Sequence, residues 1–178
     1  LDNIIIQNQG KYKFPVTHET HSGCPFSCRY CDWGLNNVPV RKMTYERVMK
    51  DIEWMGVHEI YTCYGADSNF GMFPQDIDYA DKLVQTKEKY GFPEHYFVSF
   101  SKSSDNRVFE ITRKFNLANM LQGATLSFQS LNPATLKAIG RTNMGLDRFR
   151  ALMEKYNAAG IKTYSEIILG LPCEKIGR

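Results

Sequence analysis

The chain has 178 residues, of which 43% are hydrophobic, and its formal net charge is only +3. This is enough apolar material for one domain with its own core, while the small charge and the lack of a basic run argue against nucleic acid as a partner. No apolar run approaches the ~20 residues of a membrane helix, and the first residues lack the features of a signal peptide, so no membrane partner is expected.

The chain begins with a segment that we expect to be a lead-in and connector to the core domain. Residues 1–15 combine three consecutive isoleucines with a polar connector that ends at Pro15. Residues 16–22 then predict a first strand, although its interior carries His18 and His21. A strand this polar suits an open barrel whose lumen holds a cofactor. The two histidines would line that lumen or lie in the core with their hydrogen bonds satisfied.

Three of the five cysteines come directly after this strand, with the spacing C-x3-C-x2-C: Cys24, Cys28 and Cys31. A short loop can bring three such thiolates to one metal centre. A closed zinc site takes four protein ligands, and no fourth lies nearby, whereas an iron–sulfur cube held by three cysteines leaves one iron open. An odd number of cysteines, clustered as ligands, also indicates a reducing compartment, so we expect a cytoplasmic protein.

Beyond the cysteines, apolar periodicity and turn signals predict an alternation of helices and strands. Helices are expected from Thr44 to a stop at Gly56, from Pro74 to Gly91, around residues 108–115, from Asn132 to 139, and over 146–156 before Gly160. Strands are expected over residues 57–64, 96–100, 124–128 and 161–169. This repeated order predicts an α/β fold with a parallel sheet.

The cysteine motif resembles that of the radical S-adenosylmethionine (radical SAM) superfamily. The likeness includes Tyr30 before the last cysteine, and the preceding Glu19-Thr20 and Gly23-Cys24-Pro25 are most similar to the cobalamin-dependent branch. This resemblance implies that Cys24, Cys28 and Cys31 bind a [4Fe-4S] cluster, and that its fourth iron binds the amino and carboxylate groups of SAM. It also implies that Tyr30 contacts the adenine.

The segment after the second predicted strand resembles a SAM-binding segment of the same family. Ala66 and Asp67 stand where family members usually carry Gly-Gly-Glu, which hydrogen-bonds the SAM amino group, so this chain departs from that pattern by an alanine and a shorter carboxylate. If the resemblance to the family is set aside, the residues of this segment predict a turn capped by Asp67 and Asn69.

Two later strand ends also resemble SAM-binding segments. The resemblance implies that Gln129 contacts the ribose or methionine part of SAM. It also implies that Arg141, twelve residues later, pairs with the methionine carboxylate. A guanidinium can bind a carboxylate through two parallel hydrogen bonds. Glu166, followed by Gly-Leu-Pro, would accept hydrogen bonds from the ribose or adenine, whereas Cys173 stands where the family commonly has glycine.

The resemblance implies a partial (β/α)6-type TIM-like barrel with about five strand–helix units. We expect residues 16–174 to form this core, incomplete at its C-terminal end, and residues 175–178 to be a tail. The implied activity is reductive cleavage of SAM to a 5′-deoxyadenosyl radical that abstracts hydrogen, in a cobalamin-dependent methyltransferase. No catalytic residue is assigned.

The implied cofactors are the [4Fe-4S] cluster, SAM and a cobalamin bound by a domain outside this chain. The implied partners are a small-molecule or peptide substrate and an electron donor of the flavodoxin or ferredoxin type. Two alternatives stay open: a radical SAM isomerase or oxidoreductase without cobalamin, and a structural-metal or electron-transfer module. A structural-metal or electron-transfer module would not need Gln129, Arg141 and Glu166, so these three residues count against it.

Overall fold

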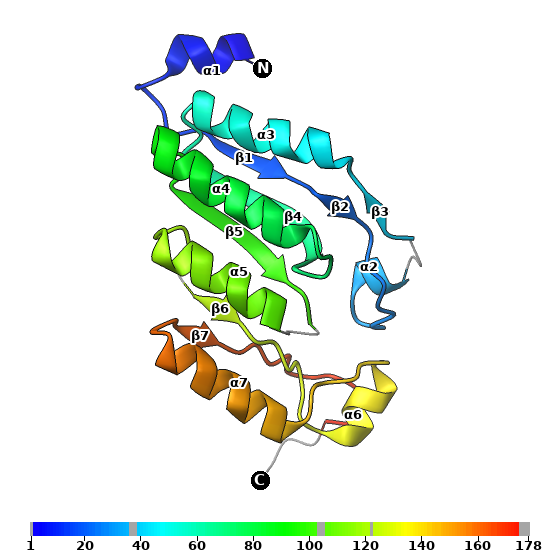
Figure 1. Ribbon diagram of the computed structural model, residues 1–178. Coiled ribbons are helices and arrows are strands. Elements are labelled where there is room, and N and C mark those ends of the chain that lie inside the picture. Colours follow the sequence, from blue (N-terminus) through cyan, green and yellow to red (C-terminus); the bar gives the residue numbers. More distant parts are fainter. Residues whose placement is uncertain (1, 36–38, 103–105, 122, 175–178) are drawn as a thin grey trace.

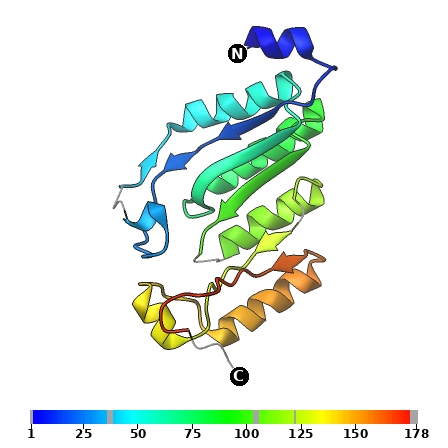
Figure 2. The same ribbon diagram turned by 180° about the vertical axis from the view of Figure 1, so that it is seen from behind.

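The centre of the molecule is a row of parallel strands. The computed structural model describes residues 2–35, 39–102, 106–121 and 123–174. Figures 1 and 2 show the strands of the row side by side in chain order: β1 (Pro15–His18), β4 (Thr62–Phe70), β5 (His95–Phe100), β6 (Ala124–Thr125) and β7 (Thr163–Tyr164). β4 pairs in parallel with both β1 and β5, and β6 pairs in parallel with β7. The parallel sheet predicted from the sequence is confirmed.

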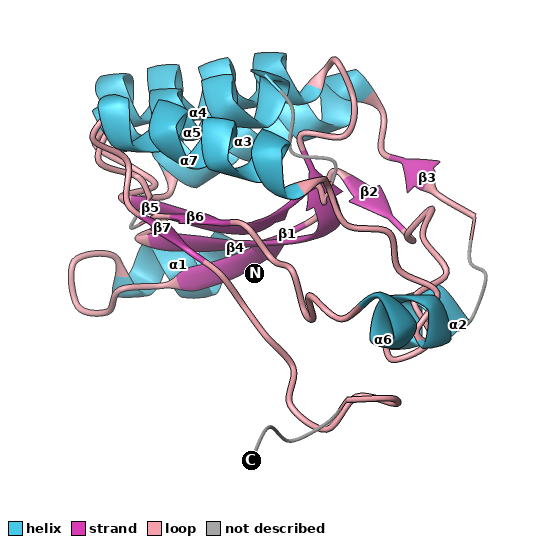
Figure 3. Ribbon diagram, turned by 90° about the horizontal axis from the view of Figure 1, so that it is seen from below, coloured by secondary structure: helices cyan, strands magenta, loops and turns pink. Residues whose placement is uncertain are grey.

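Four helices cover one face of this row, as Figure 3 shows: α3 (Tyr45–Val57), α4 (Asp76–Tyr90), α5 (Asn106–Leu117) and α7 (Leu146–Ala158). Each follows a strand in the sequence and returns the chain to the start of the next one. The architecture is therefore the partial TIM-like barrel that was expected, with its helices outside. No helix in the described ranges is long and apolar enough to cross a membrane.

The main core fills the space between the strands and α3, α4 and α5. Its fully buried side chains include Ile52, Leu83, Tyr96, Ile111 and Phe115. Each such side chain stabilises the fold by about 1.5–3 kcal/mol relative to an exposed one. A second, smaller cluster lies under α7 and contains Phe109, Ala124, Leu126, Tyr156 and Ile161.

Several short elements were not predicted. The apolar start forms a helix, α1 (Asp2–Asn8), rather than an irregular lead-in. The expected first strand divides into β1 and β2 (His21–Ser22), and β2 pairs antiparallel with β3 (Arg41–Lys42). After the cysteines the chain forms a single helical turn, α2 (Asp32–Leu35). β2, β3 and α2 lie at the same end of the sheet as α6 (Pro133–Ala138).

Strand boundaries were the least accurate predictions. The second long strand was expected over residues 57–64, but it is β4, which begins and ends later. The expected strands 124–128 and 161–169 keep regular pairing only in β6 and β7, followed by a single bridge between Gln129 and Ile167. Several residues at these irregular strand ends line the cavity described below.

The sequence predicts that Gly56 ends the helix, but α3 continues past it, and Gly56 has a packing role instead. The helix runs on to Val57, and a Cβ at Gly56 would lie 2.5 Å from both Thr86 Cγ2 and Tyr90 Cδ2. Glycine therefore allows α3 to approach α4 closely. Glycine is required at this position because a side chain would collide with the neighbouring helix, and not because of the local backbone conformation.

An ion-pair network links α3 and α4 at the surface. Glu53 accepts hydrogen bonds from Lys82 Nζ, from Tyr90 Oη at 2.5 Å and from Lys89 Nζ at 3.1 Å. The bond from Lys82, followed by those from Tyr90 and Lys89, lowers the pKa of Glu53 from its ordinary value of 4.5 to about 2. A carboxyl with a depressed pKa in the folded state stabilises the fold above pH 4.5, and that contribution is lost as the pH falls toward 2.

We therefore expect Glu53→Gln to lower the free energy of unfolding at pH 7 by up to about 1 kcal/mol, because water screens a network at the surface. The difference from the unchanged protein should shrink as the pH falls from 4.5 toward 2. Urea denaturation at several pH values measures it, with Glu88→Gln on the exposed face of α4 as the control. If the difference in the free energy of unfolding were as large at pH 3 as at pH 7, the lowered pKa of Glu53 would be contradicted.

Candidate functional site

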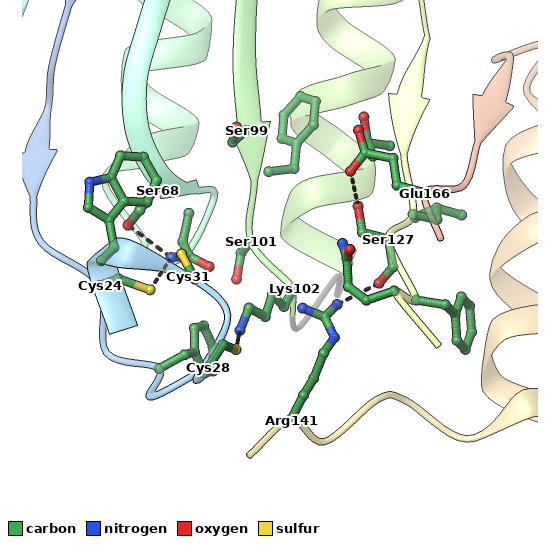
Figure 4. Close-up of a pocket in the computed structure, with 18 of the residues that line it drawn as sticks. Cys24, Cys28, Cys31, Ser68, Ser99, Ser101, Lys102, Ser127, Arg141 and Glu166 are labelled. Atoms are coloured by element: carbon green, nitrogen blue, oxygen red, sulfur yellow. Dashed lines mark hydrogen bonds between the residues drawn. The ribbon is translucent and has the colours of Figure 1, made fainter. Parts of the chain in front are cut away.

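A cavity of about 480 Å³ opens at the C-terminal ends of the strands. In barrels of parallel strands the functional groups gather at this end. Figure 4 shows the side chains that line the cavity, with the cysteines on one side and Ser127, Arg141 and Glu166 on the other. Besides these residues the lining includes Tyr30, Ser68, Asn69, Ser99, Ser101, Lys102 and Gln129.

The end of β4 holds the first part of the cysteine loop through three consecutive residues. Asp67 Oδ1 accepts hydrogen bonds from the backbone N–H groups of Thr20 and His21, at 2.9 and 2.8 Å, and from the Thr20 hydroxyl at 2.7 Å. Ser68 Oγ donates to the Gly23 carbonyl at 2.6 Å, and Asn69 Nδ2 donates to Cys24 Sγ at 3.2 Å. These three consecutive residues therefore hold the loop at three different points.

The chain after β5 holds the middle of the loop through Lys102. Its ammonium donates to Cys28 Sγ at 2.6 Å and lies 4.2 Å from the centre of the Phe26 ring. Cys28 is only 3% exposed, so the contact is largely shielded from water.

The end of α6 holds the last part of the loop. The backbone N–H of Arg29 donates to the Ile139 carbonyl at 2.9 Å, and its side chain donates to the Ala138 carbonyl at 3.1 Å. Gly140 follows with φ +66°, and a Cβ there would lie 3.2 Å from the Ser27 carbonyl oxygen. Glycine at this position allows both the left-handed backbone and the close approach of the loop.

Arg141 joins the loop to the opposite side of the cavity. Its guanidinium donates to Tyr30 Oη at 3.1 Å, to the Ser127 carbonyl at 2.6 Å and to Asn143 Oδ1 at 2.8 Å. Burial raises the pKa of Tyr30, and the nearby Arg141 opposes that rise. The side chain of Arg141 is 7% exposed and faces the cavity, so the group is oriented before any ligand arrives.

The far side of the cavity consists of the irregular ends of β6 and β7. The backbone N–H of Gln129 donates to the Glu166 carbonyl, and the Gln129 carbonyl accepts from Ile168, both at 2.9 Å. Gln129 has φ +66°, an uncommon conformation for a residue other than glycine. Ser127 Oγ donates to Glu166 Oε2 at 2.8 Å, which directs this exposed carboxylate along the cavity.

Seven of the nine residues that the sequence singled out line this one cavity: Cys24, Cys28, Cys31, Tyr30, Gln129, Arg141 and Glu166. The structure does not bring the other two to it. Ala66 is absent from the lining, and Asp67 is 1% exposed and directed toward the loop backbone. Next to them, Ser68 and Asn69 face the cavity from β4. His18 and His21 are buried, at 7% and 1% exposure, and neither lines the cavity.

Asp67 interacts with the residues that precede the cysteines. His21 Nδ1 lies 2.9 Å from Asp67 Oδ1. Burial alone would raise the pKa of Asp67, but the hydrogen bonds from His21 and Thr20 outweigh it, so the pKa lies below its ordinary value of 3.8. A charged carboxylate at this place holds the strand end and the start of the loop together.

Sequence reasoning missed Ser68, Lys102 and Ser127 as cavity residues. Each lies near the C-terminal end of a strand, and that position was the available signal, since side chains there point toward the functional end of a barrel. No motif marks them, because a single serine or lysine is common on any surface.

The donor chemistry of the cavity is compatible with an iron–sulfur cluster held by three cysteines. The three loop thiols, Cys24, Cys28 and Cys31, all line the same cavity. A cluster presents its irons at separate corners, and hydrogen bonds to its sulfurs are a normal part of such sites. Asn69 and Lys102 each donate a hydrogen bond to a cysteine sulfur, to Cys24 and Cys28 respectively.

Comparisons with known proteins agree with this geometry. The family model described as Radical SAM superfamily matches residues 19–175. The chain is 42% identical over 163 residues to the cobalamin-dependent radical SAM methyltransferase TokK of Streptomyces tokunonensis, covering 91% of this chain and 24% of that protein. It is 40% identical over 167 residues to a 2-(S-pantetheinyl)-carbapenam-3-carboxylate methyltransferase of Streptantibioticus cattleyicolor, covering 93% of this chain and 24% of that protein.

Among solved structures, the fold is similar to that of the radical SAM methyltransferase TsrM from Kitasatospora setae, with a TM-score of 0.70 at 17% identity. That match covers 92% of this chain and 32% of the other. It is also similar to methylornithine synthase, with a TM-score of 0.51 at 13% identity, over 97% of this chain and 50% of the other. The chain thus spans about a quarter of the length of the curated relatives that it matches.

Proposed function

Because the chain belongs to the radical SAM superfamily, we propose that it forms the part of a cobalamin-dependent methyltransferase that binds a [4Fe-4S] cluster and SAM. The observation that carries this proposal is the convergence on one cavity of three loop cysteines with Arg141 and Glu166. The two groups come from opposite ends of the chain and from opposite sides of the cavity. A cavity that only held a metal would have no need of the second group.

Cys24, Cys28 and Cys31 would be the protein ligands of the cluster. When bound, the cluster supplies the single electron that cleaves SAM into methionine and a 5′-deoxyadenosyl radical. The surrounding residues hold the thiols in position: Asn69 and Lys102 donate to Cys24 and Cys28. The loop is fixed at several points, so the spacing of its thiols does not depend on the loop alone.

Arg141 would bind the carboxylate of SAM. A guanidinium has five N–H donors, and the bonds to Tyr30, Ser127 and Asn143 fix its plane while leaving capacity for a ligand. Gln129 would meet the ribose or methionine part of SAM, and Glu166 would accept from the ribose or adenine. We retain Tyr30 as the adenine contact, and Ser68 and Asn69 replace Ala66 and Asp67 as our candidates on β4.

Methyl transfer is proposed from the two relatives at 42% and 40% identity, both of which are named methyltransferases. Cobalamin would be bound by a domain outside these residues. The substrate class, a small molecule or a peptide, and an electron donor of the flavodoxin or ferredoxin type, are also part of this proposal. Closing the cavity would exclude water from the radical chemistry.

The direct test is SAM cleavage by anaerobically reconstituted protein. With dithionite as reductant we expect slow formation of 5′-deoxyadenosine, with no methylated product until cobalamin and its domain are supplied. The control is the same protein without reductant, which should form none. Protein that carries a reduced cluster and binds SAM, yet forms no 5′-deoxyadenosine, would contradict the proposal.

We expect Arg141→Lys to weaken SAM binding by about tenfold or more. Lysine keeps the charge, but it cannot reproduce the planar donors that meet a carboxylate through two bonds, or the three bonds that orient the group. Isothermal titration of reconstituted protein with SAM measures the effect. Arg150→Lys on the exposed face of α7 is the matched control. Equal SAM affinity in the Arg141 variant and the control would remove Arg141 from the site.

A further inference from the structure

Lys102 is the cation in closest contact with the cysteines among the described residues. Its ammonium is 2.6 Å from Cys28 Sγ, and the sulfur belongs to a side chain that is only 3% exposed. Figure 4 shows the lysine side chain extending from the end of β5 across the cavity to the cysteine. The chain thus places a full positive charge in hydrogen-bond contact with one ligand of the proposed cluster.

Phe26 and Ser101 limit the freedom of this lysine. The ammonium lies 4.2 Å from the centre of the Phe26 ring, and the ring attracts a cation over its face. Ser101, the preceding residue, is 6% exposed and donates its backbone N–H to the Phe70 carbonyl at 2.9 Å. The lysine stem therefore starts from a fixed point on the sheet, unlike a lysine on an open surface.

A fixed charge beside a cluster acts on its two oxidation states differently. One-electron reduction takes a [4Fe-4S] cluster from 2+ to 1+, while the external donor is oxidised by one electron. No bond forms or breaks, and Lys102 keeps its proton. The reduced cluster carries more negative charge, so a nearby ammonium stabilises it more than the oxidised cluster. Net charge and hydrogen bonds to the sulfurs are among the quantities that set such potentials.

On these grounds, and resting on the proposed function, we infer that Lys102 makes the cluster easier to reduce. Lys102 is a positioning and tuning residue: it acts through Cys28 and is not assigned any contact with SAM. The same contact would also hold Cys28 in place, which is a purely structural role. The two roles are separable, because only the electrostatic one changes the reduction potential of a cluster that has formed.

The test is a potentiometric titration of anaerobically reconstituted protein, followed by the electron paramagnetic resonance (EPR) signal of the reduced cluster. Lys102→Met keeps an unbranched side chain of similar size and removes the charge. We expect its cluster to be about tenfold harder to reduce, which is a shift of about 59 mV to more negative potential for one electron. Lys102→Arg should stay near the unchanged protein, and Lys137→Met, exposed on α6, is the control for a remote charge.

Lys102→Gln covers the case in which the methionine variant does not retain the cluster. Glutamine keeps an N–H donor for Cys28 without the charge, so its cluster should still shift to more negative potential. Equal potentials in the unchanged, Met and Gln proteins, or a shift to less negative potential, would overturn the inference. An unchanged protein that forms no cluster, judged by iron content, would instead refute the proposed function.

Discussion

Cys28→Ala should reduce the iron bound after anaerobic reconstitution from about four atoms per chain to less than a tenth of that amount. The three loop cysteines are the only protein ligands that the proposed cluster has, and Cys28 is the most buried of them, at 3% exposure. Removing its thiolate leaves two ligands on a cluster that already has one iron without a protein ligand. The charge of Lys102 would also lose its partner at that position.

Two other cysteines in the same chain provide controls for this variant. Cys173 is exposed, and Cys63 is fully buried in β4 outside the cavity, where burial raises the pKa of its thiol. Cys173→Ala and Cys63→Ala should both keep the full iron content. Iron content is measured together with the visible absorption of the cluster. Stoichiometric zinc in the unchanged protein, or full iron in Cys28→Ala, would contradict the assignment of the ligands.

Asp67→Ala should destabilise the protein by about 3–5 kcal/mol, even in the absence of cluster and SAM. The substitution removes the acceptor of three hydrogen bonds and the partner of His21, and it leaves the buried donors of Thr20 and His21 unsatisfied. Losing one partner of a buried charged network costs energy in this range. Urea denaturation of the cluster-free protein measures the loss, with Asp78→Ala on the exposed side of α4 as the control.

This experiment also distinguishes the two roles that Asp67 could have. A residue that only bound the SAM amino group would leave the stability of cluster-free protein unchanged, and the variant would then match the Asp78 control. The pH dependence provides a second test. The pKa of Asp67 in the folded state lies below its ordinary value of 3.8, so its contribution is present above that value and is lost as the pH falls below it.

Local signals in the sequence were enough to predict most elements of the fold. Asn132 was expected to begin a helix, and its side chain accepts hydrogen bonds from Ala134 and Thr135 at the start of α6. Gly91 was expected to end one, and it adopts φ +82° at the end of α4. Both predictions depend only on neighbouring residues, which is why they succeed without knowledge of the tertiary structure.

Predictions failed where distant residues determine the outcome. The antiparallel pairing of β2 with β3 brings together segments about twenty residues apart, and no turn motif marks it. The direction of Asp67 depends on the register of β4 beside β1, which pairs Gly65 with His18. The pairing of β4 with β5 is irregular between Gly65 and Phe70, so strict alternation does not decide which side chains face the cavity: Ser68 and Asn69 both do, and Asp67 does not. The sequence alone could therefore identify the segment that reaches the site but not which of its side chains face it.

The measurement that tests the central claim most directly is the EPR spectrum of the dithionite-reduced cluster with and without SAM. The three thiols lie on one side of the cavity and Arg141 and Glu166 on the other, and Gln129 also lines it, so SAM would bind beside the cluster at its open iron. We expect SAM to change the spectrum of the unchanged protein. A reduced cluster whose spectrum stayed the same at saturating SAM would contradict the account.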